Sequence, residues 1–190
     1  MSLSIEKLCG KGVGVIKNRI FWLVAVIGIL LDQASKWWAV TVLQPQFEIQ
    51  LWPGVFHLTY VENFGAAWSL FENSGGFLRW ISLAVAVALM AMGLFSRLSR
   101  WEQLGYGFVL AGAVGNGIDR FVQGYVVDLF NFTLINFPVF NVADVAINIG
   151  VGCLVVATFL RARAPEPDSK TDPAEPSQPA LRDHNDPPPS

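Results

Sequence analysis

The sequence predicts an integral membrane protein of mainly α class, with four transmembrane helices and a small β-sheet between the first and second of them. Hydrophobic residues make up 53% of the 190 residues and charged residues only 15%, whereas about a quarter of the residues in a soluble domain are charged. Four apolar runs have the roughly 20 residues that a bilayer requires. The segment between the first two runs alternates apolar and polar residues, as half-buried strands do.

The first predicted span covers residues 20–43 and follows a segment at 1–19 that carries four basic residues and one acid. Asp32 and Lys36 interrupt the apolar run. The run is too long for the core of a signal peptide, and no small-residue cleavage site follows it. We therefore expect a permanent span rather than a cleaved leader.

Three further spans are predicted at residues 77–95, 104–122 and 142–160. The middle one of these three is the least apolar of all four spans, because Asn116, Asp119 and Arg120 lie in its second half. By hydropathy it is therefore the weakest of the four predicted spans.

Basic residues orient these spans. The N-terminal segment, the turn with Arg97 and Arg100, and the exit at Arg161 and Arg163 all fall on the same side of a four-span protein. Positive charge concentrates in cytoplasmic loops. We therefore expect both termini in the cytoplasm and the other two connections on the outer face.

The outer connection at about 44–76 is predicted to form the sheet. Two alternating runs flank the turn signal Pro53-Gly54, with the apolar members Phe47, Ile49 and Leu51, then Phe56, Leu58 and Tyr60. Such alternation between turn residues indicates short strands. Trp52 and Trp68 suit a membrane–water interface, so we expect the sheet to lie on the outer membrane face. A hairpin that faces water remains an equal alternative.

Two other segments differ from the spans. The connection at 123–140 is so apolar that we expect it to dip into the lipid headgroup layer. Residues 164–190 combine proline with acids, Ser and Gln, a composition that cannot bury a core. We expect a disordered cytoplasmic tail there, which leaves residues 20–163 as the membrane domain.

Cysteine and histidine usage opposes a disulfide and a metal centre. Cys9 lies in the basic N-terminal segment and Cys153 in an apolar run, so we expect no disulfide between them. His57 and His184 are the only histidines, and no His-Glu-x-x-His helix is present. We expect no metal, no cofactor and no nucleic-acid partner.

Helical rise places three polar side chains at a similar depth. At about 1.5 Å per residue, Asp32 and Asn116 each lie about 20 Å from the cytoplasmic end of their spans, and Asp144 lies roughly 25 Å from the end of its own. All three therefore reach the outer third of the membrane, where we expect them to converge. Two helix faces carry these groups: Gly112, Asn116 and Asp119 on one, and Asn141, Asp144 and Asn148 on the other.

Most of these polar residues also have a structural interpretation. Asp32 and Lys36 have the i, i+4 spacing of a structural ion pair, which we favour for them. Asp119 is interpreted as a salt-bridge partner of its neighbour Arg120, and Asn148 as part of a hydrogen bond between helices. The same hydrogen-bonding role is an alternative for Asn116 and Asn141.

Asp128 and Asp144 fit a structural interpretation least, because each lies among apolar residues with no adjacent cation. Two carboxylates held close at low dielectric share one proton, because both cannot ionise. One can then act as a general base toward water, and the other as a general acid toward a peptide carbonyl. Arg120 and nearby Asn side chains would hold substrate carbonyls or orient the pair.

Five segments together resemble one protein family. They are Asp32-Gln-Ala-Ser-Lys36, Asn63-Phe-Gly-Ala-Ala-Trp-Ser69, Gly112-Ala-Val-Gly-Asn-Gly-Ile-Asp-Arg120, Val126-Val-Asp128 and Phe137-Pro-Val-Phe-Asn-Val-Ala-Asp144. Each segment alone is a weak signal, whereas all five in the family's order are specific. From the first span through the fourth, the chain resembles lipoprotein signal peptidase, also called signal peptidase II, a family of integral membrane aspartic peptidases.

The resemblance implies four membrane helices with a periplasmic sheet called the cradle, in the bacterial inner membrane. It implies that Asp128 and Asp144 are the catalytic pair, near the periplasmic face. The implied substrates are diacylglyceryl-modified prolipoproteins, cut just before the lipidated cysteine. Substrate-binding or site-orienting roles are implied for Asn63, Asn116, Arg120 and Asn141, and supporting roles for Asp32, Lys36, Gly112, Asp119 and Ala143. With these substrates and membrane lipid as partners, we expect a monomer.

Two residues depart from the family pattern, and two rival functions remain. Trp68 and Leu129 stand where Phe is common, and we expect them to change substrate fit rather than chemistry.

One rival function is a small transporter or channel that relays ions along the acidic residues. The cytoplasmic half of the spans is apolar, which opposes this interpretation. The other is a non-catalytic assembly factor whose polar residues only lock helices together.

Overall fold

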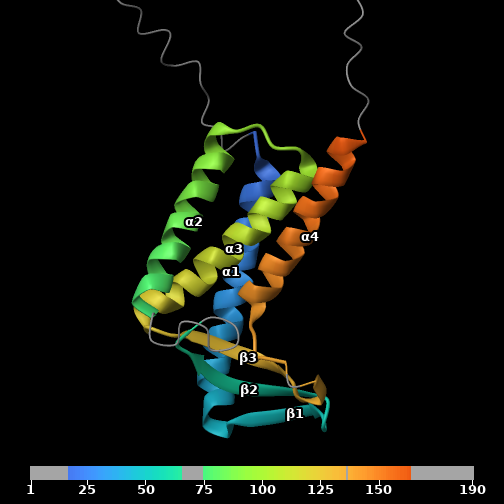
Figure 1. Cartoon of the computed structure of the whole chain (residues 1–190). Helices are drawn as coiled ribbons and strands as arrows, with labels where there is room; N and C mark the ends of the chain where they lie inside the picture. Colours follow the sequence, from blue (N-terminus) through green and yellow to red (C-terminus); the bar gives the residue numbers. More distant parts are fainter. Residues whose placement is uncertain (1–16, 66–74, 136, 164–190) are drawn as a thin grey trace, which may run out of the picture.

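The computed structural model describes residues 17–65, 75–135 and 137–163. Three predicted features lie outside these ranges: the basic segment before residue 17 with Cys9, residues 66–74 with Trp68, and the tail from residue 164 with His184. The described residues form four long helices and three strands (Figure 1). In chain order these are α1 (Arg19–Trp38), β1 (Glu48–Trp52), β2 (Phe56–Asn63), α2 (Gly75–Phe95), α3 (Arg100–Val122), β3 (Val126–Phe132) and α4 (Val142–Ala162).

The four helices form a bundle with the sheet at one end. In Figure 1 the start of α1, the α2–α3 connection and the end of α4 lie at the opposite end from the three strands. Helix α3 runs through the middle and packs against α1, α2 and α4. The polar residues Gln103, Asn116 and Asp119 of α3 are buried in this packing.

Three stretches of the described helices are long and apolar enough to cross a membrane: Arg19–Gln46, Gly76–Phe95 and Val142–Ala162. Helix α3 does not reach this apolarity, as its polar second half predicted. Asn116 and Asp119 on α3 are nevertheless buried. The packing of α3 between the other helices explains how a helix of this composition is accommodated.

The first predicted span is not one uniform helix. The α-helical part ends at Trp38, and a π-helical turn, Ala39–Leu43, continues it toward the sheet, followed by a 3-10 turn, Gln44–Gln46. Ala39 and Leu43 are fully buried and pack in a cluster with Val127 and Leu129 of β3. This contact joins the end of the first span to the sheet.

A second apolar cluster fills the bundle at the other end, with the buried members Phe21, Ala25, Ala86, Leu89 and Leu110 from α1, α2 and α3. The outer faces of the helices carry large exposed apolar side chains, such as Leu23 and Leu30, which are 61% and 63% exposed. An apolar outer surface of this kind suits contact with lipid hydrocarbon.

The sheet is antiparallel, with strand order β1-β2-β3. Its first two strands confirm the prediction from alternating residues, and the turn between them uses Gly54 at a φ of +74°, a conformation that favours glycine. Ile49 on β1 lies opposite Leu58 on β2. These two side chains pack toward the cluster around Leu43.

The third strand corrects one prediction. The connection at 123–140 was expected to be a loop in the headgroup layer, whereas its first half is β3, which pairs with β2 so that Asp128 lies opposite Val61. Val126, Val127 and Leu129 are buried in the protein, because the strand lies between β2 and the helices. The later part of the connection is exposed at Leu134 and Ile135.

Candidate active site

Asp144 lies in the first turn of α4, and its position follows from a local capping motif. Asn141 is the N-cap residue, and its Oδ1 accepts a hydrogen bond from the Asp144 backbone N–H at 3.0 Å. In return, the Asp144 Oδ2 accepts from the Asn141 N–H at 3.1 Å. This reciprocal arrangement satisfies two N–H groups at the helix start. It holds the Asp144 side chain at the sheet end of the bundle.

Asp128 lies on β3 and is 1% exposed. Its two oxygens accept hydrogen bonds from the Asn63 Nδ2 at 2.9 Å and from the Asn141 Nδ2 at 2.6 Å. Burial raises the pKa of Asp128 to about 7, and the negative charge of Asp144 acts in the same direction, whereas the two Asn donors oppose the rise. Asp128 is therefore poised to hold a proton near neutral pH.

Asn141 connects the two carboxyl groups. Its side-chain Nδ2 donates to Asp128, and its backbone N–H donates to Asp144. The Oδ1 of Asn141 is already used as the helix cap, so its Nδ2 must point toward Asp128. One residue at the start of α4 thus orients both acids predicted to form the catalytic pair.

Asn116 forms a second connection, from α3. Its Nδ2 donates to the Asp144 Oδ1 at 2.9 Å. Its Oδ1 accepts from the Lys36 Nζ at 2.9 Å and from the Asn141 Nδ2 at 3.0 Å. Asn116 and Asp144, which were expected to converge from separate spans, are therefore joined directly. Lys36 of the first span contacts the same Asn116 side chain.

The ion pair predicted within the first span is present, and it is larger than predicted. The Lys36 Nζ lies 2.9 Å from the Asp32 Oδ2 and 2.9 Å from the Asp119 Oδ2. The interpretation of Asp119 as a partner of Arg120 is therefore corrected, because its carboxylate pairs with Lys36 across the helix interface. All three members of this ion network are buried.

The two supporting positions without charge lie where α3 meets α4. Gly112 is so close to α4 that a side-chain carbon added to it would collide with the Ala143 carbonyl oxygen and with Ile147. Ala143 is 1% exposed, and its backbone N–H donates to Asp32. Asn148 differs from its prediction, since it donates to the Asp144 carbonyl oxygen within its own helix.

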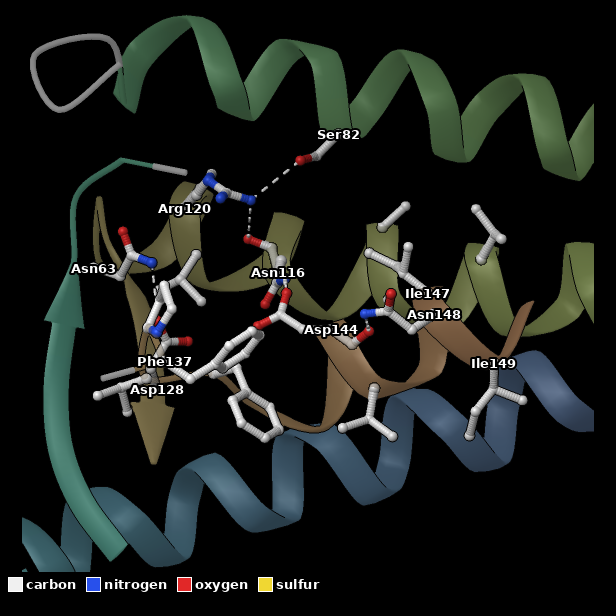
Figure 2. A pocket seen from close by; sticks show the side chains of 18 of the residues that line it. Asn63, Ser82, Asn116, Arg120, Asp128, Phe137, Asp144, Ile147, Asn148 and Ile149 are labelled. Atoms are coloured by element: carbon white, nitrogen blue, oxygen red, sulfur yellow. Dashed lines mark hydrogen bonds between the residues drawn. The ribbon is translucent and has the colours of Figure 1, made fainter. Parts of the chain in front are cut away.

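Arg120 lies apart from the ion network. Its guanidinium donates to the Ser82 Oγ at 3.4 Å, the Asn116 carbonyl oxygen at 3.4 Å and the Gly65 carbonyl oxygen at 3.3 Å. These contacts place it between α2, α3 and the end of β2, as Figure 2 illustrates for Ser82 and Asn116.

A cavity of about 1010 Å³ joins these groups. Figure 2 shows Asn63, Arg120 and Asp128 toward one end of it, Asp144 in the middle, and Ile147 and Ile149 toward the other end. Most of the wall is apolar, with contributions from Ile81, Val85, Val109, Val126, Phe132 and Phe140. The arrangement presents two carboxyl groups and a cation to a hydrophobic ligand.

Two contributors were not identified from the sequence. The Gln33 Nε2 donates to Asp32, to Asp119 and to the Gly115 carbonyl oxygen, each at 3.2 Å. Its place beside Asp32 in the first motif was the available signal. Ser82, the partner of Arg120, had no such signal, because a serine in an apolar run is common in membrane helices. Within the described ranges, no three His, Cys, Asp or Glu side chains gather as metal ligands would.

Comparison with known proteins supports a family assignment. The family model described as signal peptidase (SPase) II matches residues 24–160. A lipoprotein signal peptidase of Cyanothece sp. is 52% identical over 171 residues, which cover 88% of this chain and 96% of that protein. One from Microcystis aeruginosa is 58% identical over 145 residues, which cover 75% of this chain and 94% of that protein.

Solved structures show the same architecture. A bacterial membrane enzyme determined by the in meso method at 2.3 Å resolution superposes with a TM-score of 0.70 at 28% identity, covering 79% of this chain and 94% of that one. A second such structure, at 1.9 Å resolution, gives a TM-score of 0.64 at 29% identity. The matched sequence spans all four helices and the sheet, so the chain belongs to the signal peptidase II family.

Proposed function

We propose that this chain is a membrane-embedded aspartic endopeptidase that removes the signal peptide from diacylglyceryl-modified prolipoproteins, cutting just before the lipidated cysteine. Membership of the signal peptidase II family supports peptidase action on lipoprotein signal peptides. The observation that carries the catalytic proposal is Asn141, which hydrogen-bonds Asp128 with its side chain and Asp144 with its backbone beside one cavity.

The different surroundings of the two acids suggest different roles. Asp128 is buried and, with its pKa raised to about 7, carries a proton in a large share of molecules at neutral pH. We assign it as the general acid that protonates the scissile carbonyl oxygen. Asp144 is more accessible and lies on the cavity wall. We assign it as the general base that takes a proton from the water attacking the carbonyl carbon. The C–N bond then breaks as Asp144 gives that proton to the leaving nitrogen, and Asp128 takes its proton back from a hydroxyl of the tetrahedral intermediate.

The cavity also suits the proposed substrate. Its apolar wall, which includes Val85, Val109 and Ile149, matches hydrocarbon from a signal peptide or a diacylglycerol group. At its polar end, the Arg120 guanidinium offers N–H donors to backbone carbonyls of an extended peptide. A lipid-modified precursor would therefore bind with its scissile bond at the polar end of the cavity.

The proposed orientation follows from charge and from the shape of the bundle. Basic residues Arg97, Arg100 and Arg161 belong to the end opposite the sheet, which we assign to the cytoplasm. The candidate site then lies near the periplasmic face of the inner membrane. We propose residues 20–163 as the peptidase domain and a monomer as the acting species.

Cleavage of a purified prolipoprotein in detergent tests the proposal. We expect Asp128→Asn and Asp144→Asn each to lower the rate by at least about 10³-fold, since removing one member of an acid–base pair disables the other. Glu62→Gln, an exposed acid on the adjacent strand, is the matched control and should cleave at the wild-type rate. Wild-type rates in both Asp variants would refute the aspartic mechanism.

The substrate is tested separately with precursor that lacks the diacylglyceryl group. We expect the wild-type enzyme to leave this precursor uncut at concentrations where the modified one is processed. Equal cleavage of the two would remove lipid selection from the proposal and leave the catalytic pair unaffected. A transporter or an assembly factor would cut neither.

A further inference from the structure

We propose that Asp32, Lys36 and Asp119 form a clamp that sets the separation between the two catalytic aspartates. The proposal rests on the catalytic roles of Asp128 and Asp144 given above. None of these three residues lines the cavity, so they act as positioning residues. Their effect passes through the backbone on which the catalytic side chains are carried.

The first arm of the clamp holds α4. The Asp32 Oδ1 on α1 accepts a hydrogen bond at 2.9 Å from the backbone N–H of Ala143, the residue immediately before Asp144. The two partners are 111 residues apart in the chain. Because this N–H lies in the first turn of α4, it has no partner within the helix, and the carboxylate from α1 satisfies it.

The second arm holds β3 in the same way. The Asp119 Oδ2 on α3 accepts a hydrogen bond at 3.1 Å from the backbone N–H of Val127, the residue immediately before Asp128. This bond is buried. Each catalytic aspartate therefore directly follows a residue whose N–H is held by a noncatalytic aspartate.

Lys36 joins the two arms. Its Nζ lies 2.9 Å from Asp32, 2.9 Å from Asp119 and 2.9 Å from the Asn116 Oδ1, so its three N–H bonds can all be used. Because an ammonium only donates, it also forces the Asn116 oxygen toward itself and the Asn116 Nδ2 toward Asp144. Lys36 thus couples both backbone positions to the orientation of one catalytic side chain.

The burial of the clamp fits a positioning role. Asp32 is 0% exposed, Asp119 1% and Lys36 3%. Buried charges of this kind often contribute little net stability, because desolvation offsets their attraction. They do favour one geometry, since every displaced partner leaves a buried charge unpaired. A small error in the separation of reacting groups can lower a rate by about 10²-fold.

The atoms involved predict an asymmetry between the two acids. On Asp119, the single oxygen Oδ2 accepts from both Val127 and Lys36, so an Asn with one oxygen can preserve both clamp bonds and loses only the bond that Oδ1 accepts from the Gln33 side chain. On Asp32, Oδ1 accepts from Ala143 while Oδ2 pairs with Lys36, so an Asn must lose one of them. Conservative substitution should therefore be tolerated at position 119 and not at position 32.

The test compares kcat, KM and pH profiles of four full-length variants in detergent, per folded molecule. We expect Asp119→Leu to lower kcat about 100-fold and to leave KM within about twofold of the wild-type value. The remaining Asp32–Lys36 pair is still neutral overall, so this substitution leaves no unpaired buried charge. Asp119→Asn should recover kcat to within about fivefold of wild type, and Asp32→Asn should remain at least about 20-fold below it. In Asp119→Leu, the pH at which the rate falls to half its maximum on the alkaline side should be lower than in the wild type. The reason is that Asp128 moves away from the negative charge of Asp144, which lowers the pKa of Asp128.

Asn18→Ala is the matched control. Asn18 is buried at the other end of the bundle, where it donates to the Gly93 and Ser96 carbonyl oxygens at 2.8 Å each. We expect it to lower the melting temperature without changing kcat or the pH profile. If Asp119→Leu did not fold, the milder Asp119→Ser would replace it, and we expect the same fall in kcat for that variant.

Two results would overturn the clamp, and they differ from failure of the catalytic proposal. Wild-type kcat and pH profile in folded Asp119→Leu would leave Asp119 a purely structural role. Equal tolerance of Asn at positions 32 and 119 would contradict the atomic arrangement. If Asp128→Asn were itself active, the catalytic proposal would fail and the clamp with it, whereas an inactive Asp128→Asn confines the failure to the clamp.

Discussion

At the scale of single residues, Asp128 occupies a position that opposes its own ionisation. The carboxyl group is 1% exposed, and burial is the main reason for its raised pKa. A group whose charged form is disfavoured in the folded state reduces stability at a pH where it must ionise. A catalytic role for Asp128, as proposed above, would be an instance of the conflict between stability and activity at catalytic sites.

This pKa predicts how activity and stability respond to pH. The value for Asp128 rises from 3.8 to about 7 on folding, so kcat/KM should fall as the pH rises through about 7, where the general acid loses its proton. Between those two values the folded state holds the proton more tightly than the unfolded state. The free energy of unfolding should therefore decrease as pH rises across this window.

Unfolding of the wild type and Asp128→Asn, measured with denaturant in detergent at several pH values, checks the stability part. The variant lacks the titrating group, so its unfolding free energy should decrease less from about pH 4 to pH 7, by roughly 3 kcal/mol. Parallel curves for the two proteins would contradict the raised pKa. Glu62→Gln, an exposed acid on β2, should follow the wild type.

At the scale of elements, α3 combines two properties that are usually separate. It contributes Asn116 and Asp119 to the polar network, and it approaches α1 and α4 closely through small residues. A side-chain carbon added at Gly115 would collide with the Asp32 carboxylate, and one at Gly112 would collide with α4. The glycines therefore allow the ion network to form at short distances.

A pair of glycine substitutions tests this packing. Gly115→Ala should destabilise the protein by about 1 to 3 kcal/mol, because it overpacks a buried contact with Asp32. Gly117→Ala lies two residues away, where the nearest atom, the Ser82 Cβ, would be 3.4 Å from the added carbon. We expect it to be neutral or slightly stabilising. Thermal unfolding of the two purified variants provides the comparison, and equal melting temperatures would refute the close approach.

The strand β3 shows how an element can serve two purposes. Its buried residues Val127 and Leu129 attach the sheet to the end of the first span. Asp128 lies between them in sequence and, by the alternation of a strand, projects to the other face, toward Asn63 and Asn141. The same strand therefore anchors the sheet and presents a catalytic candidate.

At the scale of the whole molecule, polar groups gather toward the sheet end of the bundle. Buried Phe21 and Ala25 precede Asp32 in α1 and belong to an apolar cluster shared with α2 and α3. This cluster separates the polar network from the end where the chain enters and leaves the bundle. A site accessible from one side of a membrane fits this arrangement better than a path across it.

Cysteine labelling tests the orientation. In a background with Ser at positions 9 and 153, we expect Gln50→Cys on β1 to react with a membrane-impermeant maleimide in intact cells. We expect Ser96→Cys, in the α2–α3 connection, to react only after the membrane is opened. Both positions are exposed in the structure. The reverse pattern would place the sheet in the cytoplasm and contradict the positive-inside assignment.

The sequence by itself determined the helices, the first two strands and the identity of the residues with costly polar groups in apolar surroundings. Long apolar runs and strict alternation are local patterns, so they can be read without knowledge of distant contacts. The same is true of the start of α4, where Asn141 and Asp144 have the spacing of a capping box. Membrane depth was also local information, and it correctly suggested that Asp32, Asn116 and Asp144 converge.

Only the tertiary structure decided the partners. Asp119 next to Arg120 suggested a local salt bridge, whereas the fold pairs it with Lys36 from another helix. The third strand was taken for a loop, because its pairing with β2 depends on a segment more than 60 residues earlier. The backbone N–H groups of Val127 and Ala143 carry no sequence signal at all. Long-range hydrogen bonds depend on which surfaces meet, and local patterns do not contain that information.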